Sequence, residues 1–395
     1  MENKAIAQNK NLNIEIIRSL SLLMILLFHF GGLVHGNDRT HHELFNFILN
    51  LGGEVGVTLF FIISGYGIFH SLNHTFEKGG FSYRNFILRR LQRLAPSYYL
   101  GLIFMLCIGD GAWYLGKEHI LNIIMHFLFL HGFVPSYSGA IIGSAWYLST
   151  QFILYLIAPL CFLYLFYWKH EAKHGVNVFV SLFVSIILTV ASKFFMFHTI
   201  VPLLGFNNSY NFWAGRTIFI CVLDNFVMGM TIAFIEKNCK PLVRNNCIRM
   251  VLAILSACMI YVVAVYLGRK GIHTDNLYGY TFHSVLAFSC SLFIYFASSI
   301  RLSDKTKQHN LFIKVLLWLS KYSYAIFLLH LEIARNIMAK SPIFIMLKDK
   351  HKILAYLLLY LITISFGYIL HNISEKMNLF HIPTAQNNKN KENIK

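Results

Sequence analysis

The chain has 395 residues, of which 56% are hydrophobic and only 13% are charged, whereas soluble proteins carry roughly 25% charged residues. Apolar runs long enough to cross a bilayer core of about 30 Å recur along the sequence, which excludes a soluble enzyme and indicates an integral membrane protein. The formal charge of +17 is distributed over short loops between these runs, so no basic domain and no nucleic-acid partner are expected.

The expected fold class is all-α, a polytopic transmembrane helical bundle, because outer-membrane strands would alternate in character over about ten residues. The seven cysteines are scattered without a C-x-x-C pair, so neither a disulfide nor a cysteine metal site is expected. In chain order, the candidate segments are residues 12–34, 55–72, 95–109, 119–134, 145–168, 176–198, 216–236, 248–268, 282–300, 315–333 and 352–373.

The fourth of these segments, 119–134, differs from the others. It is short, contains three histidines and is followed by a turn-rich stretch, residues 135–139. If it does not cross, most Lys and Arg residues fall on the side of the N-terminus, as the positive-inside rule requires. We therefore expect about ten spans, with 119–134 re-entrant or interfacial. Residues 1–11 would be a cytoplasmic segment, 12–373 the membrane domain and 374–395 a disordered cytoplasmic tail.

The first segment carries two ionisable residues, Arg18 and His29, within an otherwise apolar run. Eleven residues correspond to about three helical turns, so both lie on one face, roughly 16 Å apart along the axis. Glu15 is placed three residues before Arg18, where it can form an ion pair. A buried arginine costs about 2.5–3.5 kcal/mol on insertion scales, so such residues normally face a protein interior. Snorkelling of Arg18 and an interfacial His29 remain the structural alternatives.

The loop before the third segment holds a basic cluster of Arg84, Arg89, Arg90 and Arg93. If this loop is helical, Arg90 and Arg93 share a face and could grip the phosphates of a nucleotide-bearing donor. The cluster could equally be an orientation signal or contact anionic lipid. Pro96 would then occupy the first turn of the third helix.

Several other polar positions admit two interpretations. Ser64-Gly65 is typical of close helix packing, and Trp146 of an interfacial anchor. His330 is either a core or a site residue. Asp224, which is ionisable within a span, is a candidate site residue or a structural partner.

Two further features are interpreted as structural. Lys193 lies near the end of a span and is expected to snorkel. His70 and His74 have i, i+4 spacing but lack a third ligand, so no metal site is expected.

Five motifs occur in a fixed order on this pattern of spans. They are Arg18-x(10)-His29, the stretch from Gly56 to Tyr66 that contains Phe60-Phe61-x-x-Ser64-Gly65, Arg90-x-x-Arg93, the stretch around Trp146, and Tyr324-Ala-Ile-Phe-Leu-Leu-His330. In this order, from about residue 12 to 373, the chain resembles the acyltransferase family 3 of integral membrane enzymes, which O-acylate bacterial surface glycans and some other acceptors. It departs from the usual pattern at Glu15, where Asp is common, and at Phe327, where Tyr is usual.

The resemblance implies roles for particular residues. His29 would be the catalytic base, with Arg18 and Glu15 beside it in the catalytic set. Arg90, Arg93 and Arg89 would bind the acyl-CoA donor at the cytoplasmic face. The positions that would line the site are Ser64, Tyr66, Trp146, Asp224, Tyr324 and His330.

The expected function is therefore an O-acyltransferase, most simply an O-acetyltransferase, of the bacterial inner membrane. It would move an acetyl or other short acyl group from acyl-CoA to a cell-surface polysaccharide or its lipid-linked precursor, without a metal. A lipid-glycan flippase or other transporter also suits buried charges in a bundle. A glycan polymerase is less consistent with the short loops.

Overall fold

The computed structural model describes residues 11–35, 43–108, 111–167, 174–301, 310–377 and 379–380, and in these ranges it contains helices and turns but no strand. Ten helices are long and apolar enough to cross a membrane. They are α2 (Leu12–His35), α3 (Glu43–Glu77), α4 (Tyr83–Ile108), α7 (Trp146–Phe162), α8 (His174–Phe195), α10 (Leu223–Asn238), α11 (Asn246–Gly268), α12 (Leu277–Ser298), α14 (Leu311–Glu332) and α16 (Lys352–Ser374). The expected polytopic all-α bundle is confirmed.

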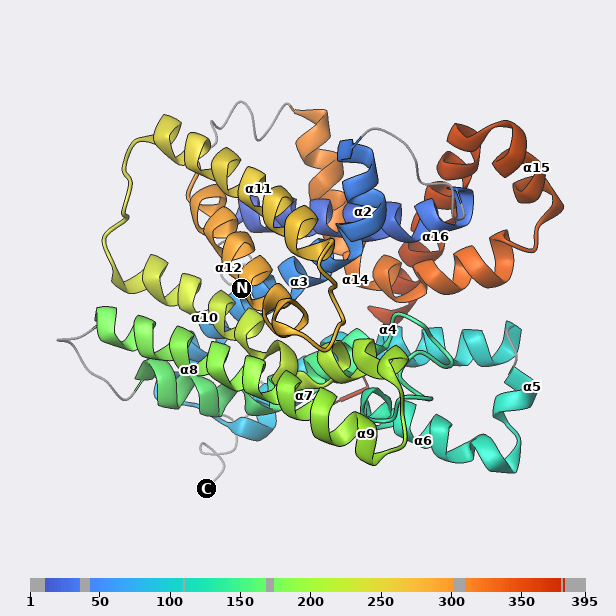
Figure 1. Cartoon of the computed structure of the whole chain (residues 1–395), viewed down its shortest axis with the longest axis horizontal. Coiled ribbons are helices and arrows are strands. Elements are labelled where there is room, and N and C mark those ends of the chain that lie inside the picture. The colour runs from blue at the N-terminus through green and yellow to red at the C-terminus, as the bar shows by residue number, and fades with distance from the viewer. Residues whose placement is uncertain are drawn as a thin grey trace, which may run out of the picture.

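The bundle is organised around α3, which packs extensively on both α2 and α10 (Figure 1). The helices α8, α11 and α16 lie at the periphery and expose Leu and Ile side chains, as is expected for surfaces in contact with lipid. Successive spanning helices run in opposite directions across the bundle. The side at which α2 begins is called the near side, and the side at which it ends is called the far side. The predicted tails, 1–11 and 374–395, lie largely outside the described residues.

Close approach of α3 and α10 depends on two glycines. A Cβ on Gly65 would lie 1.9 Å from the carbonyl oxygen of Phe226, and one on Gly229 would lie 1.9 Å from that of Ile62. Only glycine permits two helix backbones to come this near. The packing interpretation of the Ser64-Gly65 pair therefore holds for its glycine.

The third spanning helix differs from the expected one. It begins at Tyr83, not near residue 95, and Pro96 lies in its interior. The arginines at positions 84–93 lowered the apolar character of this stretch, but two of them, Arg90 and Arg93, line an interior cavity and the helix continues through them. Because proline lacks an amide hydrogen, Pro96 removes one intrahelical hydrogen bond.

Segment 119–134 does not cross the bundle. It forms a 3₁₀ turn at Lys117–His119, helix α6 (Ile120–Phe127) and a second 3₁₀ turn at His131–Phe133. One face of α6 exposes Leu121 and Ile124, whereas Asn122 and His126 are buried against the protein. This amphipathic pattern is typical of a helix that lies in a membrane interface.

Two buried histidines hold this segment against the bundle. The rings of His126 and His131 stack 4.1 Å apart at 11°, and His131 Nε2 lies 3.0 Å from the carbonyl oxygen of Ala145 at the start of α7. Burial lowers the pKa of His126 to about 4 and that of His131 to about 3. Both rings are therefore neutral at physiological pH.

Candidate active site

A cavity of about 130 Å³ lies in the near-side half of the bundle, between α2, α3, α4, α7 and α14. Three guanidinium groups reach it from two helices. The residues that line it are Arg18, Phe60, Ile63, Ser64, Gly67, Ile68, Arg90, Arg93, Leu94, Tyr147, Leu148, Gln151, Tyr155, Ser323, Tyr324 and Phe327. The sequence motifs around residues 18, 64, 90 and 324 thus meet at one place.

Arg18 is held at this cavity by an ion pair. Its Nη1 lies 2.7 Å from Glu15 Oε2, as the spacing predicts, and Ser320 of α14 also donates a hydrogen bond to that carboxylate. The hydroxyl of Ser19 donates a hydrogen bond to the carbonyl oxygen of Leu316, which also lies in α14. This face of α2 therefore lies against α14 and not against lipid.

The arginines of α4 fall into two groups. Arg90 points inward, where its Nη2 lies 2.5 Å from Ser71 Oγ and its guanidinium lies 5.8 Å from the centre of the Tyr155 ring. Arg93, one turn later, lines the same cavity and is solvent-exposed. Arg89 is exposed and does not line the cavity, so only Arg90 and Arg93 share the predicted face.

Three of the expected lining residues differ in their surroundings. Ser64 and Tyr324 line the cavity, and Tyr324 donates a 2.9 Å hydrogen bond to the carbonyl oxygen of Leu94. Tyr66 does not line it, since its hydroxyl donates to Glu236 Oε2 of α10 at 2.6 Å. The side chain of Tyr66 turns away because it lies two residues after Ser64, which is about 200° around the helix axis.

His29 lies beyond the far end of this cavity, beside His330 of α14. Their ring centres are 5.0 Å apart, and His330 Nδ1 lies 2.5 Å from the carbonyl oxygen of Phe327. Phe327 packs against Phe60 and Tyr147, with ring centres 5.7 and 5.3 Å away, and so forms the boundary between the cavity and the two histidines. The two ends of the α2 face thus meet different chemical surroundings.

The chain segment before α7 is fixed beside these histidines. Glu332 Oε1 accepts a 2.6 Å hydrogen bond from the amide of Gly143, and Ser144 donates to the carbonyl oxygen of Leu328 at 2.8 Å. Trp146 follows at the first position of α7, half-buried, with its ring 5.6 Å from that of Phe212. Trp146 is thus a far-side residue and does not line the arginine cavity.

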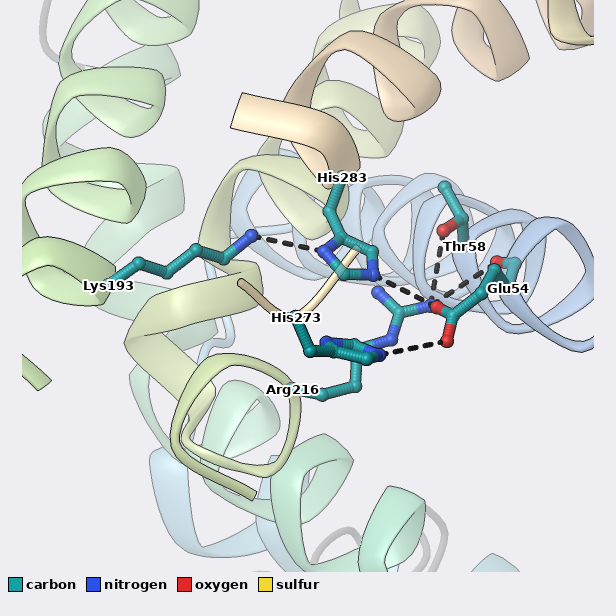
Figure 2. Close-up of polar contacts among 6 residues, drawn as sticks. All are labelled: Glu54, Thr58, Lys193, Arg216, His273 and His283. Atoms are coloured by element: carbon teal, nitrogen blue, oxygen red, sulfur yellow. Dashed lines mark hydrogen bonds and ion pairs between the residues drawn. The ribbon is translucent and has the colours of Figure 1, made fainter. Parts of the chain in front are cut away.

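A second group of charged residues, unexpected from the sequence, gathers at the far side (Figure 2). Glu54 of α3 is its centre. Arg216 Nη2 lies 3.4 Å from Glu54 Oε2, His283 Nε2 lies 2.9 Å from the same oxygen, and His273 Nε2 lies 3.3 Å from Oε1. Arg216 also donates to Thr58 at 3.2 Å.

Lys193 does not snorkel, contrary to expectation. It is completely buried, with its Nζ 3.2 Å from His283 Nδ1, and it interacts electrostatically with the buried carboxylate of Asp224. Asp224 therefore belongs to this group and not to the arginine cavity. The sequence signals for this group were Asp224, which is ionisable within a span, and Glu54, which directly precedes the segment 55–72.

The donor atoms of Glu54, His273 and His283 lie within 4.8 Å of one another, as in a metal site. Two imidazoles and a carboxylate would suit Zn²⁺, but metal-bound histidines normally direct their second nitrogen to a carbonyl or carboxylate. Here Lys193 faces the second nitrogen of His283, and Arg216 contacts the carboxylate. The positive charges of Lys193 and Arg216 suit a hydrogen-bonded Glu54 carboxylate better than a site for a divalent metal ion.

Comparison with known proteins gives one match. The model of the acyltransferase family 3, described as an acyltransferase domain, matches residues 11–372, which is nearly the whole chain. Neither the curated proteins nor the solved structures give a match.

Proposed function

Because the chain belongs to this acyltransferase family, we propose that it is a membrane O-acyltransferase that carries a short acyl group, acetyl in the simplest case, from acyl-CoA to a hydroxyl group of a cell-surface glycan or its lipid-linked precursor. The observation that carries this proposal is the arrangement along α2. Arg18 lies in a guanidinium-lined cavity at one end, and the His29–His330 pair lies at the other.

The arginine cavity is suited to the donor. Guanidinium groups grip phosphate oxygens in pairs, and the exposed Arg93 stands at the mouth where nucleotide phosphates would arrive. Arg90 is already fixed by Ser71, so it offers a preorganised charge. The near side would then be the cytoplasm and the membrane the bacterial inner membrane, which agrees with both ends of an even-numbered bundle lying on the side rich in Lys and Arg.

His29 is suited to proton transfer. Its neutral imidazole would remove the proton of the acceptor hydroxyl while that oxygen attacks the thioester carbonyl. When the carbon–sulfur bond breaks, the protonated His29 would return the proton to the CoA thiolate, so the transfer needs no external proton. Transient acylation of His29 is the covalent variant of this step.

The separation of Arg18 and His29, roughly 16 Å along the helix axis, gives them different tasks. Arg18, paired with Glu15, would hold the donor in its cavity, whereas charge developing on the thioester carbonyl would lie near His29. His29 interacts electrostatically with Arg335, which lies in the π-helical turn Ile333–Met338 directly after α14 and is a candidate to stabilise that charge. The acyl group would reach His29 past Phe327.

The proposal is tested with the purified full chain in lipid nanodiscs, [1-¹⁴C]acetyl-CoA and surface polysaccharide from a strain that lacks the protein. Label should enter the polysaccharide, and alkali should release it as acetate because the linkage is an ester. Movement of a lipid-linked glycan across a vesicle membrane with no label incorporated would instead identify a transporter.

A further inference from the structure

The two histidines that contact Glu54, His283 and His273, differ in how many of their ring nitrogens are used. Lys193 Nζ donates to His283 Nδ1, so the hydrogen of His283 lies on Nε2 and points to Glu54. Both nitrogens of His283 are thereby used, and its side chain is only 1% exposed. His273 donates its Nε2 hydrogen to the other oxygen of Glu54, which leaves Nδ1 as an acceptor, and 25% of its side chain is exposed.

Backbone contacts hold the loop that carries His273. Asn211 Nδ2 donates a 3.2 Å hydrogen bond to the carbonyl oxygen of His273. Gly271 has φ +108, a conformation that other residues rarely adopt, and Asn276 caps the first turn of α12 by accepting from Gly279. His273 is therefore held in place from its backbone and, through Glu54, from its ring.

Aromatic rings continue from His273 along the same surface. The His273 ring meets Phe212 edge-on at 5.0 Å, and Phe212 meets Trp146 edge-on at 5.6 Å. Phe212 is 39% exposed, so part of its ring is accessible. An accessible aromatic face next to a fixed hydrogen-bond acceptor matches a pyranose ring, which has an apolar C–H face and a rim of hydroxyl groups.

This surface lies beside His29. Gly53, which precedes Glu54, packs directly on the ring of Phe28, where a Cβ would lie 2.7 Å from Cδ1. Phe28 and His29 are consecutive, and His29 interacts electrostatically with Glu54. The arginine cavity opens at the other end of the bundle.

We propose that His273, oriented by Glu54 and flanked by Phe212 and Trp146, is the binding site for the sugar ring of the acceptor on the far side of the membrane. His273 Nδ1 accepts a hydrogen bond from a sugar hydroxyl, and Phe212 covers the C–H face. His273 is a binding residue and Glu54 its positioning residue, while proton transfer stays with His29. This inference rests on the proposed function, since it names where that reaction takes its acceptor.

The test uses His273→Ala and Phe212→Ala in the nanodisc assay described above. His198→Ala is the matched control, because His198 is also a far-side histidine bonded to a carboxylate, that of Asp275. We expect the KM for polysaccharide to rise at least tenfold in both test variants. The KM for acetyl-CoA and the rate of acetyl-CoA hydrolysis without polysaccharide should stay within threefold of wild type, as should every constant of the control.

Three results would overturn the inference. An unchanged polysaccharide KM in His273→Ala would remove the site, whatever happens to its melting temperature. A rise in both KM values together would indicate a structural role. Stoichiometric zinc in the wild-type protein that is lost in His273→Ala would assign the cluster to a metal. If the wild type itself transfers no acetyl group, the proposed function fails first and this inference with it.

Discussion

His29 and His330 face each other with ring centres 5.0 Å apart, and His330 Nδ1 is engaged by the carbonyl oxygen of Phe327. The hydrogen of His330 therefore lies on Nδ1, which leaves Nε2 as an acceptor. Within the described part of the chain, this Nε2 is buried without a hydrogen-bond partner. The contact between the two rings restricts the orientation of His29, and Nε2 of His330 is left to accept a hydrogen bond.

Replacement of His330 by alanine should lower kcat by roughly 10- to 100-fold, a part of the 10²–10⁴ that a general base typically contributes. The KM for acetyl-CoA should change little, because His330 does not line the arginine cavity. His330→Gln, which keeps an acceptor group, should recover part of the rate and restore the pH–rate profile. The control is His70→Ala on α3, away from the site, and an equal loss of rate in that variant would argue against a positioning role.

Arg93→Ala should raise the KM for acetyl-CoA about 10- to 100-fold, since a hydrogen bond to a charged group is worth about 1.5–3 kcal/mol. The same variant should leave the KM for acetyl-pantetheine unchanged, because that donor lacks the nucleotide phosphates. Arg84→Ala, an exposed position on the same helix outside the cavity, is the control. Equal effects on both donors would place the phosphates elsewhere.

The melting temperature should fall when the pH drops below about 6.5. Burial holds the pKa of His126 at about 4 and that of His131 at about 3, below the ordinary value near 6.5. Protons therefore bind the unfolded chain more readily. Each histidine lowers the free energy of unfolding by about 1.4 kcal/mol for every unit that the pH falls between 6.5 and its folded pKa. His126→Phe should flatten this slope while keeping a stacked ring. A slope unchanged from wild type, or one that His198→Phe flattens equally, would contradict this assignment.

Gly65→Ala should destabilise the bundle by about 1–3 kcal/mol, because the new methyl group would meet the backbone of α10. Gly67→Ala is its matched control on the same helix, since nothing lies within 4 Å of a Cβ at that position. It should be neutral or stabilising by up to about 1 kcal/mol through helix propensity. Thermal denaturation in detergent compares the two, and equal melting temperatures would mean that α3 and α10 separate easily.

The sequence predicted the ten helices well because each contains a long apolar run, and it predicted the Glu15–Arg18 pair because residues three apart are neighbours on a helix surface. The predicted start of α4 was wrong, since hydropathy treats inward-facing arginines as if they faced solvent. The far-side group was missed for a different reason. Glu54, Lys193, Arg216, His273 and His283 come from five separate segments, and no spacing rule links residues so far apart in the chain.

The most direct test of the whole account is the rate of [1-¹⁴C]acetyl transfer by His29→Gln, with its fold verified by a wild-type melting temperature. The account predicts a loss of at least about 100-fold in kcat with an unchanged KM for acetyl-CoA, because the donor cavity lies at the other end of α2. Transfer at the wild-type rate by this folded variant would contradict the role assigned to His29.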